Sequence, residues 1–105
     1  DVYKRQDLEG AVADFTRAIE LDGSDARAWA GRGGALAERG EVDAAILDFA
    51  RASELDPDDG IVWTKLGILR ASSGDTAGAR RDLGRALALG AAIPEAHAAL
   101  QAIGG

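Results

Sequence analysis

The glycine cluster Gly31-Arg32-Gly33-Gly34 is the segment of this 105-residue chain that most resembles a ligand-binding motif. A glycine-rich loop between a strand and a helix exposes backbone N–H groups that can bind phosphate. No strand pattern precedes this cluster, and a helical pattern of apolar residues continues through it. We therefore predict a helix, in which Gly33 allows a close helix crossing. Gly31 and Gly34 each cost about 1 kcal/mol relative to Ala, unless another group approaches their backbone.

His97 is the only histidine, and the chain has no cysteine. These counts exclude a His-rich or cysteine metal site, a disulfide and a cysteine nucleophile. A Ser-His-Asp triad would need His97, which has no suitable partner at helical spacing. We expect His97 to be a packing residue. No catalytic, cofactor-binding or metal-binding residue is predicted, and the chain is not expected to be an enzyme.

Aspartate and arginine recur three residues apart, in the pairs Asp14/Arg17, Asp48/Arg51 and Asp82/Arg85. Residues at this spacing are neighbours on a helix, and such an ion pair contributes about 0.2–0.5 kcal/mol. We expect these pairs near the outer face of their helices, where they stabilise the surface. A docking ladder for a partner is the alternative.

The composition is that of a globular protein, with 47% hydrophobic and 29% charged residues. A formal net charge of −6 disfavours binding to nucleic acid or to anionic membranes. No apolar run is long enough to span a membrane. The absence of cysteine is compatible with the cytoplasm, which is the favoured but not the established location.

A repeat with an interval of 34 positions organises the chain. The matching sets are Ala11/Ala45/Ala79, Phe15/Phe49/Leu83, Ala18/Ala52/Ala86, Trp29/Trp63, Gly33/Gly67 and Gly40/Gly74. The apolar spacing within each unit predicts two amphipathic helices. A glycine in the left-handed conformation would end the first helix, and an acidic residue would begin the second. The expected helices span residues 7–21, 25–39, 41–55, 59–73, 75–89 and 94–103.

This pattern resembles the tetratricopeptide repeat (TPR) family, whose signature places Trp, Leu-Gly, Ala, Phe, Ala and Pro at fixed spacing. The residues that carry the resemblance in the best unit are Trp29, Gly33, Leu36, Ala45, Phe49, Ala52 and Pro57. Arg32 and Arg70 depart from the family pattern, because both stand at bulky apolar positions. The resemblance implies an all-α fold, an α-solenoid of stacked antiparallel helix pairs forming a fragment of a right-handed superhelix.

The same resemblance implies a division of the chain into one array. Residues 1–25 would supply only the second helix of a truncated repeat, residues 26–59 and 60–93 two complete repeats, and residues 94–105 a terminal helix. The first six residues also resemble translated adapter DNA, so we assign them no function. Because the chain contains no methionine, we expect it to be a piece of a longer protein.

Members of this family bind a partner's peptide or helix in a concave groove lined by the first helix of each unit. The residues at groove positions are Arg27, Ala30, Gly31, Gly34, Ala37 and Glu38, then Ile61, Thr64, Lys65, Ile68, Ala71 and Ser72, and last Glu95, Ala98, Ala99 and Ala102. One subfamily binds chaperone C-termini through a Lys and Asn clamp. This chain has no Asn, and Ala30 and Gly34 occupy clamp positions, so chaperone tails are not expected as partners.

We expect a non-catalytic protein-interaction scaffold that binds a protein or peptide without any cofactor. Two alternatives remain open: a structural spacer or self-association segment of a longer solenoid, and the regulatory arm of a larger enzyme.

Overall fold

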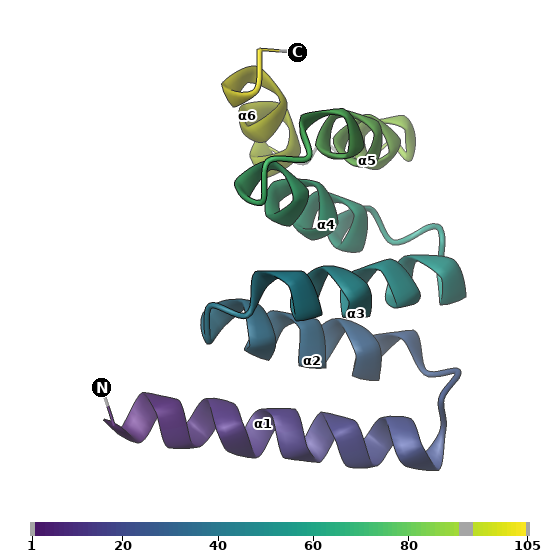
Figure 1. Cartoon of the computed structure of the whole chain (residues 1–105). Helices are drawn as coiled ribbons and strands as arrows, with labels where there is room; N and C mark the ends of the chain where they lie inside the picture. The colour runs from purple at the N-terminus through teal and green to yellow at the C-terminus, as the bar shows by residue number, and fades with distance from the viewer. Residues whose placement is uncertain (1, 91–93, 105) are drawn as a thin grey trace. The chain divides into compact units, whose positions relative to one another are not determined.

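Six α-helices account for almost all of the described chain in the computed structural model, which describes residues 2–90 and 94–104 (Figure 1). They are α1 (Val2–Leu21), α2 (Ala26–Glu38), α3 (Val42–Leu55), α4 (Gly60–Ser72), α5 (Thr76–Ala88) and α6 (Pro94–Ala102). The described residues contain no strand, so the all-α prediction is confirmed. None of the helices in this part of the chain is long and apolar enough to cross a membrane.

The helices form two compact units, which meet in sequence between Leu55 and Asp56. Unit 1 contains α1, α2 and α3, and α2 packs against both of its neighbours. Unit 2 contains α4, α5 and α6, and α5 packs against both of its neighbours. Successive helices of unit 1 run antiparallel, and so do α4 and α5 of unit 2 (Figure 1).

Glycine produces the turn between the two helices of each pair, as the sequence predicts. Gly40 and Gly74 have φ angles of +83° and +94°, a region that side chains disfavour. The next N–H reaches back to the last turn of the helix: Glu41 N donates to Leu36 O at 2.9 Å, and Asp75 N donates to Arg70 O at 2.8 Å. These bonds satisfy carbonyls that the helix end leaves free.

Helix α1 begins at Val2, five residues before the predicted start. In the 34-residue register, Gln6 stands where Gly40 and Gly74 make their turns. A glutamine is a good helix former and disfavours the left-handed conformation, so the helix continues through this position.

Two aspartates and two tryptophans fix how α2 and α4 begin. The side chains of Asp25 and Asp59 cap these helices by accepting hydrogen bonds from backbone N–H groups of the first turn. The indole N–H of Trp29 donates to Gly23 O at 2.9 Å, and that of Trp63 donates to Pro57 O at 2.8 Å. In both units, the tryptophan therefore bonds to the carbonyl six residues before it and fixes the loop that precedes the helix.

The predicted close approaches at Gly33 and Gly67 are confirmed. A Cβ atom at Gly33 would lie 3.0 Å from a ring carbon of Phe49, and one at Gly67 would lie 2.7 Å from Cγ of Leu83. The ring of Phe15 lies against Gly31 and would collide with a Cβ there, which explains a glycine in mid-helix. Gly34 has nothing within 4 Å of a Cβ position, so no contact requires it to be glycine.

This contrast predicts opposite effects of the same substitution. Gly34→Ala should raise the free energy of unfolding by about 0.5–1 kcal/mol, because Ala is the better helix former and the space is open. Gly67→Ala should lower it by about 1–3 kcal/mol, because Leu83 is fully buried and cannot move away freely. Urea unfolding followed by circular dichroism measures both, and equal shifts in the two variants would contradict the packing described.

The core of unit 2 corrects one expectation about α6. Leu83, Ala86 and Ala96 form a buried cluster, against which Trp63 and Leu100 pack. His97 is exposed and does not belong to this cluster. The expectation that His97 packs is therefore wrong, because α6 places Ala96 and Leu100 in the core of the unit and leaves the His97 side chain in solvent.

Candidate functional site

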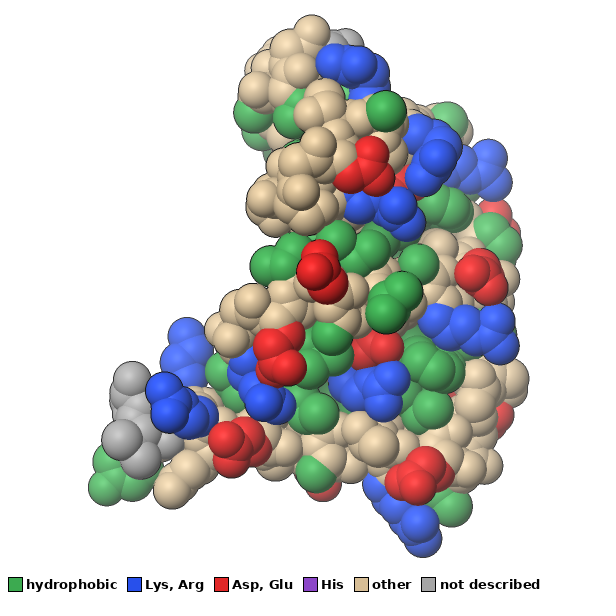
Figure 2. All heavy atoms as spheres, viewed as in Figure 1, with side chains coloured by type: hydrophobic (Ala, Val, Ile, Leu, Met, Phe, Trp, Pro, Cys, Tyr) green, Lys and Arg blue, Asp and Glu red, His purple; other side chains and the backbone are tan. Residues whose placement is uncertain are grey.

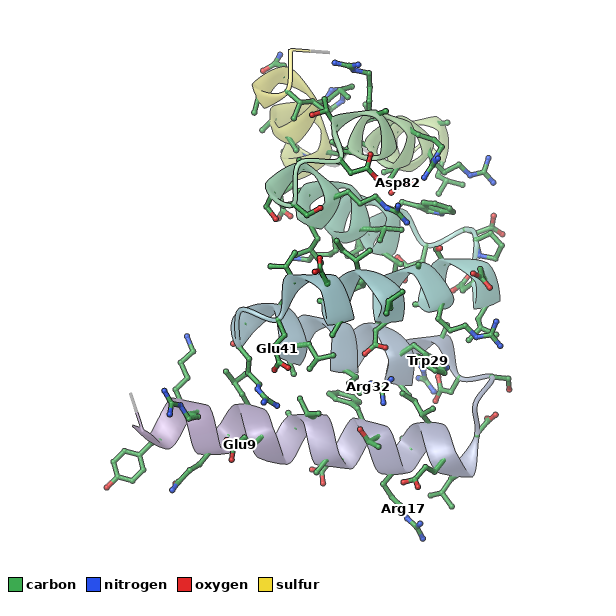
Figure 3. The ribbon with its side chains drawn as sticks, viewed as in Figure 1. Glu9, Arg17, Trp29, Arg32, Glu41 and Asp82 are labelled. Atoms are coloured by element: carbon green, nitrogen blue, oxygen red, sulfur yellow. The ribbon has the colours of Figure 1, made fainter. Side chains whose placement is uncertain are left out.

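A buried ion pair joins α2 to α3 in unit 1. Arg32 Nε lies 2.7 Å from Asp48 Oδ2, and Arg32 Nη2 lies 2.9 Å from Asp48 Oδ1, so the guanidinium holds both carboxylate oxygens. Arg32 Nη1 also donates to Thr16 Oγ1 of α1 at 3.3 Å, and Cζ lies 5.1 Å from the centre of the Trp29 ring. Figure 3 shows Arg32 and Trp29 beside each other. The bond to Asp48 raises the pKa of Arg32, because it favours the charged guanidinium more than burial disfavours it.

A second buried pair joins α4 to α5 in unit 2. Arg70 Nε lies 2.8 Å from Asp82 Oδ2, although the N–H does not point at this oxygen in an aligned hydrogen bond. Arg81 Nε lies 3.5 Å from Asp82 Oδ1, and Arg70 also lies 3.5 Å from Asp75. Asp82 is only 1% exposed. Burial raises the pKa of Asp82, and the attraction of Arg70 and Arg81 opposes this rise only in part.

These pairs correct the expected Asp–Arg ladder. Asp48 and Asp82 are 4% and 1% exposed, so they do not lie on the outer face. Their partners come from the preceding helix, while Arg51 pairs with Glu54 at 3.1 Å. The other members of these pairs, Asp14, Arg17, Arg51 and Arg85, are exposed as expected, and Arg17 points away from α2 (Figure 3).

The sequence did contain a signal for the true partners. Arg32 and Leu36 of unit 1 align with Leu66 and Arg70 of unit 2, so each unit has one arginine and one leucine at these two positions, in opposite order. The two positions lie one helical turn apart on the same face. An arginine at either one reaches the carboxylate of the second helix, which explains both departures from the family pattern.

The first-helix surface of unit 1 is small and open. Arg27 and Glu38 are exposed, and Ala30, Gly34 and Ala37 are partly exposed. Gly31, also expected in the groove, lies against Phe15 instead. On the face seen in Figure 2, acidic and basic side chains of unit 1 are intermixed, with hydrophobic side chains between them.

The first-helix surface of unit 2 combines apolar and charged side chains from α4 and α6. Ile61 is 64% exposed, and Lys65 Nζ lies 3.8 Å from Glu95 Oε2 across the two helices. Ile68 packs partly against the core of the unit. Of the other expected residues, Ser72, Ala98 and Ala102 are exposed, and Ala71 and Ala99 are partly buried.

Thr64 was expected in the groove, but its side chain is buried and is not accessible to a partner. It is 2% exposed, and its hydroxyl donates to Gly60 O at 2.8 Å within α4. No group of three or more His, Cys, Asp and Glu side chains among the described residues could hold a metal ion.

The comparisons with known proteins identify the family. The sequence profile of the tetratricopeptide repeat family matches residues 1–60. The chain belongs to the tetratricopeptide repeat family. A search of curated protein sequences finds no match.

Solved TPR structures share the fold. The TPR domain of Arabidopsis OM64 is 26% identical, with a TM-score of 0.87, and the match covers 96% of this chain and 84% of that domain. The Yersinia enterocolitica type III secretion chaperone SycD, solved with a peptide of the translocator YopD, is 25% identical, with a TM-score of 0.85 and coverage of 96% and 82%. The TPR2B domain of yeast Sti1, in complex with an Hsp70 peptide, is 23% identical, with a TM-score of 0.88 and coverage of 97% and 86%. At that identity, the last likeness shows the fold alone.

One cleft of this TPR chain was missed by the sequence reasoning. An open cleft of about 590 Å³ in unit 1 is lined by Lys4, Arg5, Leu8 and Glu9 of α1 and by Glu38, Arg39 and Glu41 at the turn between α2 and α3. Glu9 and Glu41 mark its two sides in Figure 3. Two of the lining residues, Lys4 and Arg5, lie in the part of α1 that precedes the predicted helix start. Arg39 Nε already pairs with Glu41 Oε2 at 2.9 Å, so part of the charge in the cleft is neutralised internally.

Proposed function

We propose that this TPR chain binds a peptide segment of a partner protein on the first-helix surfaces of its units. The observation that carries the proposal is the strip of α4 and α6 formed by Ile61, Lys65 and Glu95. Ile61 leaves a large apolar side chain in water, which binding to a partner would cover. Lys65 and Glu95 are about half exposed and 3.8 Å apart, so each can exchange its present partner for a charge on a peptide at little cost.

The surface of unit 1 supports the same function through its small side chains. Gly34 leaves open space, and the neighbouring Ala30 and Ala37 are small, so the side chains of a bound peptide can approach α2 closely. Arg27 and Glu38 stand near the two ends of this helix and would select a peptide with complementary charges.

The expected ligand is an internal peptide segment with an apolar side chain near an acidic one, to match Ile61 and Lys65. A chaperone C-terminus is a poorer candidate, although TPR structures with chaperone peptides share the fold. The chain has no Asn for a carboxylate clamp, and Ala30 and Gly34 provide no side-chain donor at two clamp positions.

A peptide selected from a random library displayed on phage tests the proposal. Lys65→Glu and Ile61→Asp should each weaken binding of the selected peptide about tenfold or more, because they reverse a contacting charge or place a charge in an apolar contact. Leu47→Asp is the matched control, since Leu47 is 72% exposed but lies on α3. Dissociation constants from fluorescence anisotropy decide the result. A library that yields no binder, or binders equally affected by Leu47→Asp, would contradict the proposal.

A further inference from the structure

Helix α5 differs from α1 and α3 in the charge of one stripe of side chains. The stripe on α5 consists of Ala77, Arg81, Arg85 and Ala88, which lie on one face because they are four, four and three residues apart. We call these four residues the α5 stripe. At intervals of 34 positions they match Glu9, Ala13, Arg17 and Glu20 of α1, and Asp43, Leu47, Arg51 and Glu54 of α3. The stripes of α1 and α3 each contain two acids and one arginine, whereas the α5 stripe contains two arginines and no acid.

The stripe faces solvent in all three helices. Its four positions are exposed on α1, on α3 and on α5. Helix α3 has helices before and after it in the chain, and Leu47 in its stripe is still 72% exposed. The 34-residue register therefore keeps these positions accessible even on a helix with neighbours on both sides in sequence.

The α5 stripe lacks the acid that pairs with the equivalent arginine of α3. On α3, Arg51 Nη1 lies 3.1 Å from Oε2 of Glu54, three residues later. Ala88 stands at the position of Glu54. Within the part of the chain that the structure describes, the Arg85 side chain makes no hydrogen bond or ion pair. Its charge is therefore available to a partner.

The groups beside the α5 stripe leave it positive. Arg80 is exposed, and its Nη2 donates to Ile103 O at 3.3 Å, which is a neutral acceptor. The Arg81 side chain is 69% exposed, and its Nε lies 3.5 Å from the buried carboxylate of Asp82, which Arg70 approaches more closely at 2.8 Å. Basic side chains gather over α5 on the face seen in Figure 2. A local excess of positive charge thus stands on a chain whose formal net charge is −6.

We propose that the α5 stripe binds an acidic segment of a partner protein through Arg81 and Arg85. The two arginines are one helical turn apart, so carboxylates at helical spacing match them. Clustered arginines recognise acidic motifs, because a guanidinium can donate two parallel hydrogen bonds to a carboxylate. Gly84 lies between them with nothing within 4 Å of a Cβ position, so the segment can approach α5 closely. The site lies on the second helix of its pair, apart from the first-helix surfaces of the proposed function.

The charge of the whole chain favours a short acidic segment over other anionic partners. A nucleic acid that extends beyond the α5 stripe would be repelled by a chain with a net charge of −6. A second copy of the chain would bring the same net charge, which opposes association. Asp56 and Asp58 of such a copy are exposed and could still meet arginines, so the test includes the oligomeric state.

A labelled synthetic peptide of alanine and glutamate, with the glutamates three and four residues apart, is the probe. Fluorescence anisotropy with the whole chain at physiological ionic strength should show saturable binding, which added salt weakens. A peptide with glutamine at the same positions should not bind. Arg85→Glu in the chain should weaken binding about fivefold or more, because it reverses a contacting charge. Ala88→Glu should weaken it by a similar factor while keeping every arginine, because the new carboxylate would pair with Arg85 as Glu54 pairs with Arg51.

Arg51→Glu is the matched control, because it makes the same charge change at the equivalent position of α3, between Asp43 and Glu54. It should leave binding of the glutamate peptide unchanged. Lys65→Glu should also leave it unchanged, which separates this site from the first-helix surface. All four variants should keep the circular dichroism spectrum of the native chain, since the changed positions are exposed or half-exposed.

Three results would overturn the proposal. The first is no saturable binding of the glutamate peptide, or equal weakening of binding by Arg85→Glu and Arg51→Glu. The second is a concentration-dependent dimer in sedimentation that Arg85→Glu dissolves, because a second copy would then occupy the α5 stripe. The third is tighter binding of a single-stranded DNA oligonucleotide than of the peptide, because the stripe would then serve a nucleic acid.

Discussion

Arg70→Leu is expected to lower the free energy of unfolding by about 3 kcal/mol. The change removes the closest cation from Asp82, which is 1% exposed and cannot recover its hydration in the folded state. Arg81 remains 3.5 Å away, so the carboxylate keeps one weaker partner. Urea unfolding followed by circular dichroism at 222 nm measures the loss. Arg85→Leu is the control: Arg85 is exposed, so its substitution should stay within about 0.5 kcal/mol.

The double variant Leu66→Arg/Arg70→Leu should recover most of this loss. It gives unit 2 the order of arginine and leucine that unit 1 has at Arg32 and Leu36. The new arginine would reach Asp82 from one helical turn earlier, as Arg32 reaches Asp48. A double variant no more stable than Arg70→Leu alone would show that the two positions are not interchangeable.

Phe49→Ala is expected to lower the free energy of unfolding by about 3–5 kcal/mol. The ring is 5% exposed and packs against Gly33, where no side chain can move in to fill the cavity. A domain of this size is stable by only about 5–15 kcal/mol, so the helices of unit 1 should lose most of their structure well below the native melting temperature.

Thermal and urea unfolding of Phe49→Ala should therefore show an early loss of helical signal. Leu47→Ala, two residues earlier on the same helix, is the control, because Leu47 is 72% exposed and its truncation should cost less than about 0.5 kcal/mol. Retained helical circular dichroism with an unchanged midpoint in Phe49→Ala would contradict the packing described for unit 1.

The helices and turns were predictable because the interactions that define them lie close in sequence. A left-handed residue at position 40 or 74 requires glycine, whatever packs nearby. Likewise, Gly33 aligns with Gly67 in the repeat, and the large residues that they contact, Phe49 and Leu83, align with each other. The early start of α1 has the same local cause, because Gln6 stands at the position of the turn glycines and continues the helix instead of ending it.

The family and the all-α fold thus follow from residue order alone, because periodicity and turn chemistry are local properties of the chain. The partners of Asp48 and Asp82 do not follow from it, since an aspartate with an arginine three residues later satisfies the helical spacing equally well. The rotation of each helix about its axis chooses between these arrangements, and packing against neighbouring helices sets that rotation. The same rotation buries Thr64, exposes His97 and places Phe15 against Gly31. Side-chain pairing between helices is a property of three-dimensional packing, which a pattern along one helix does not contain.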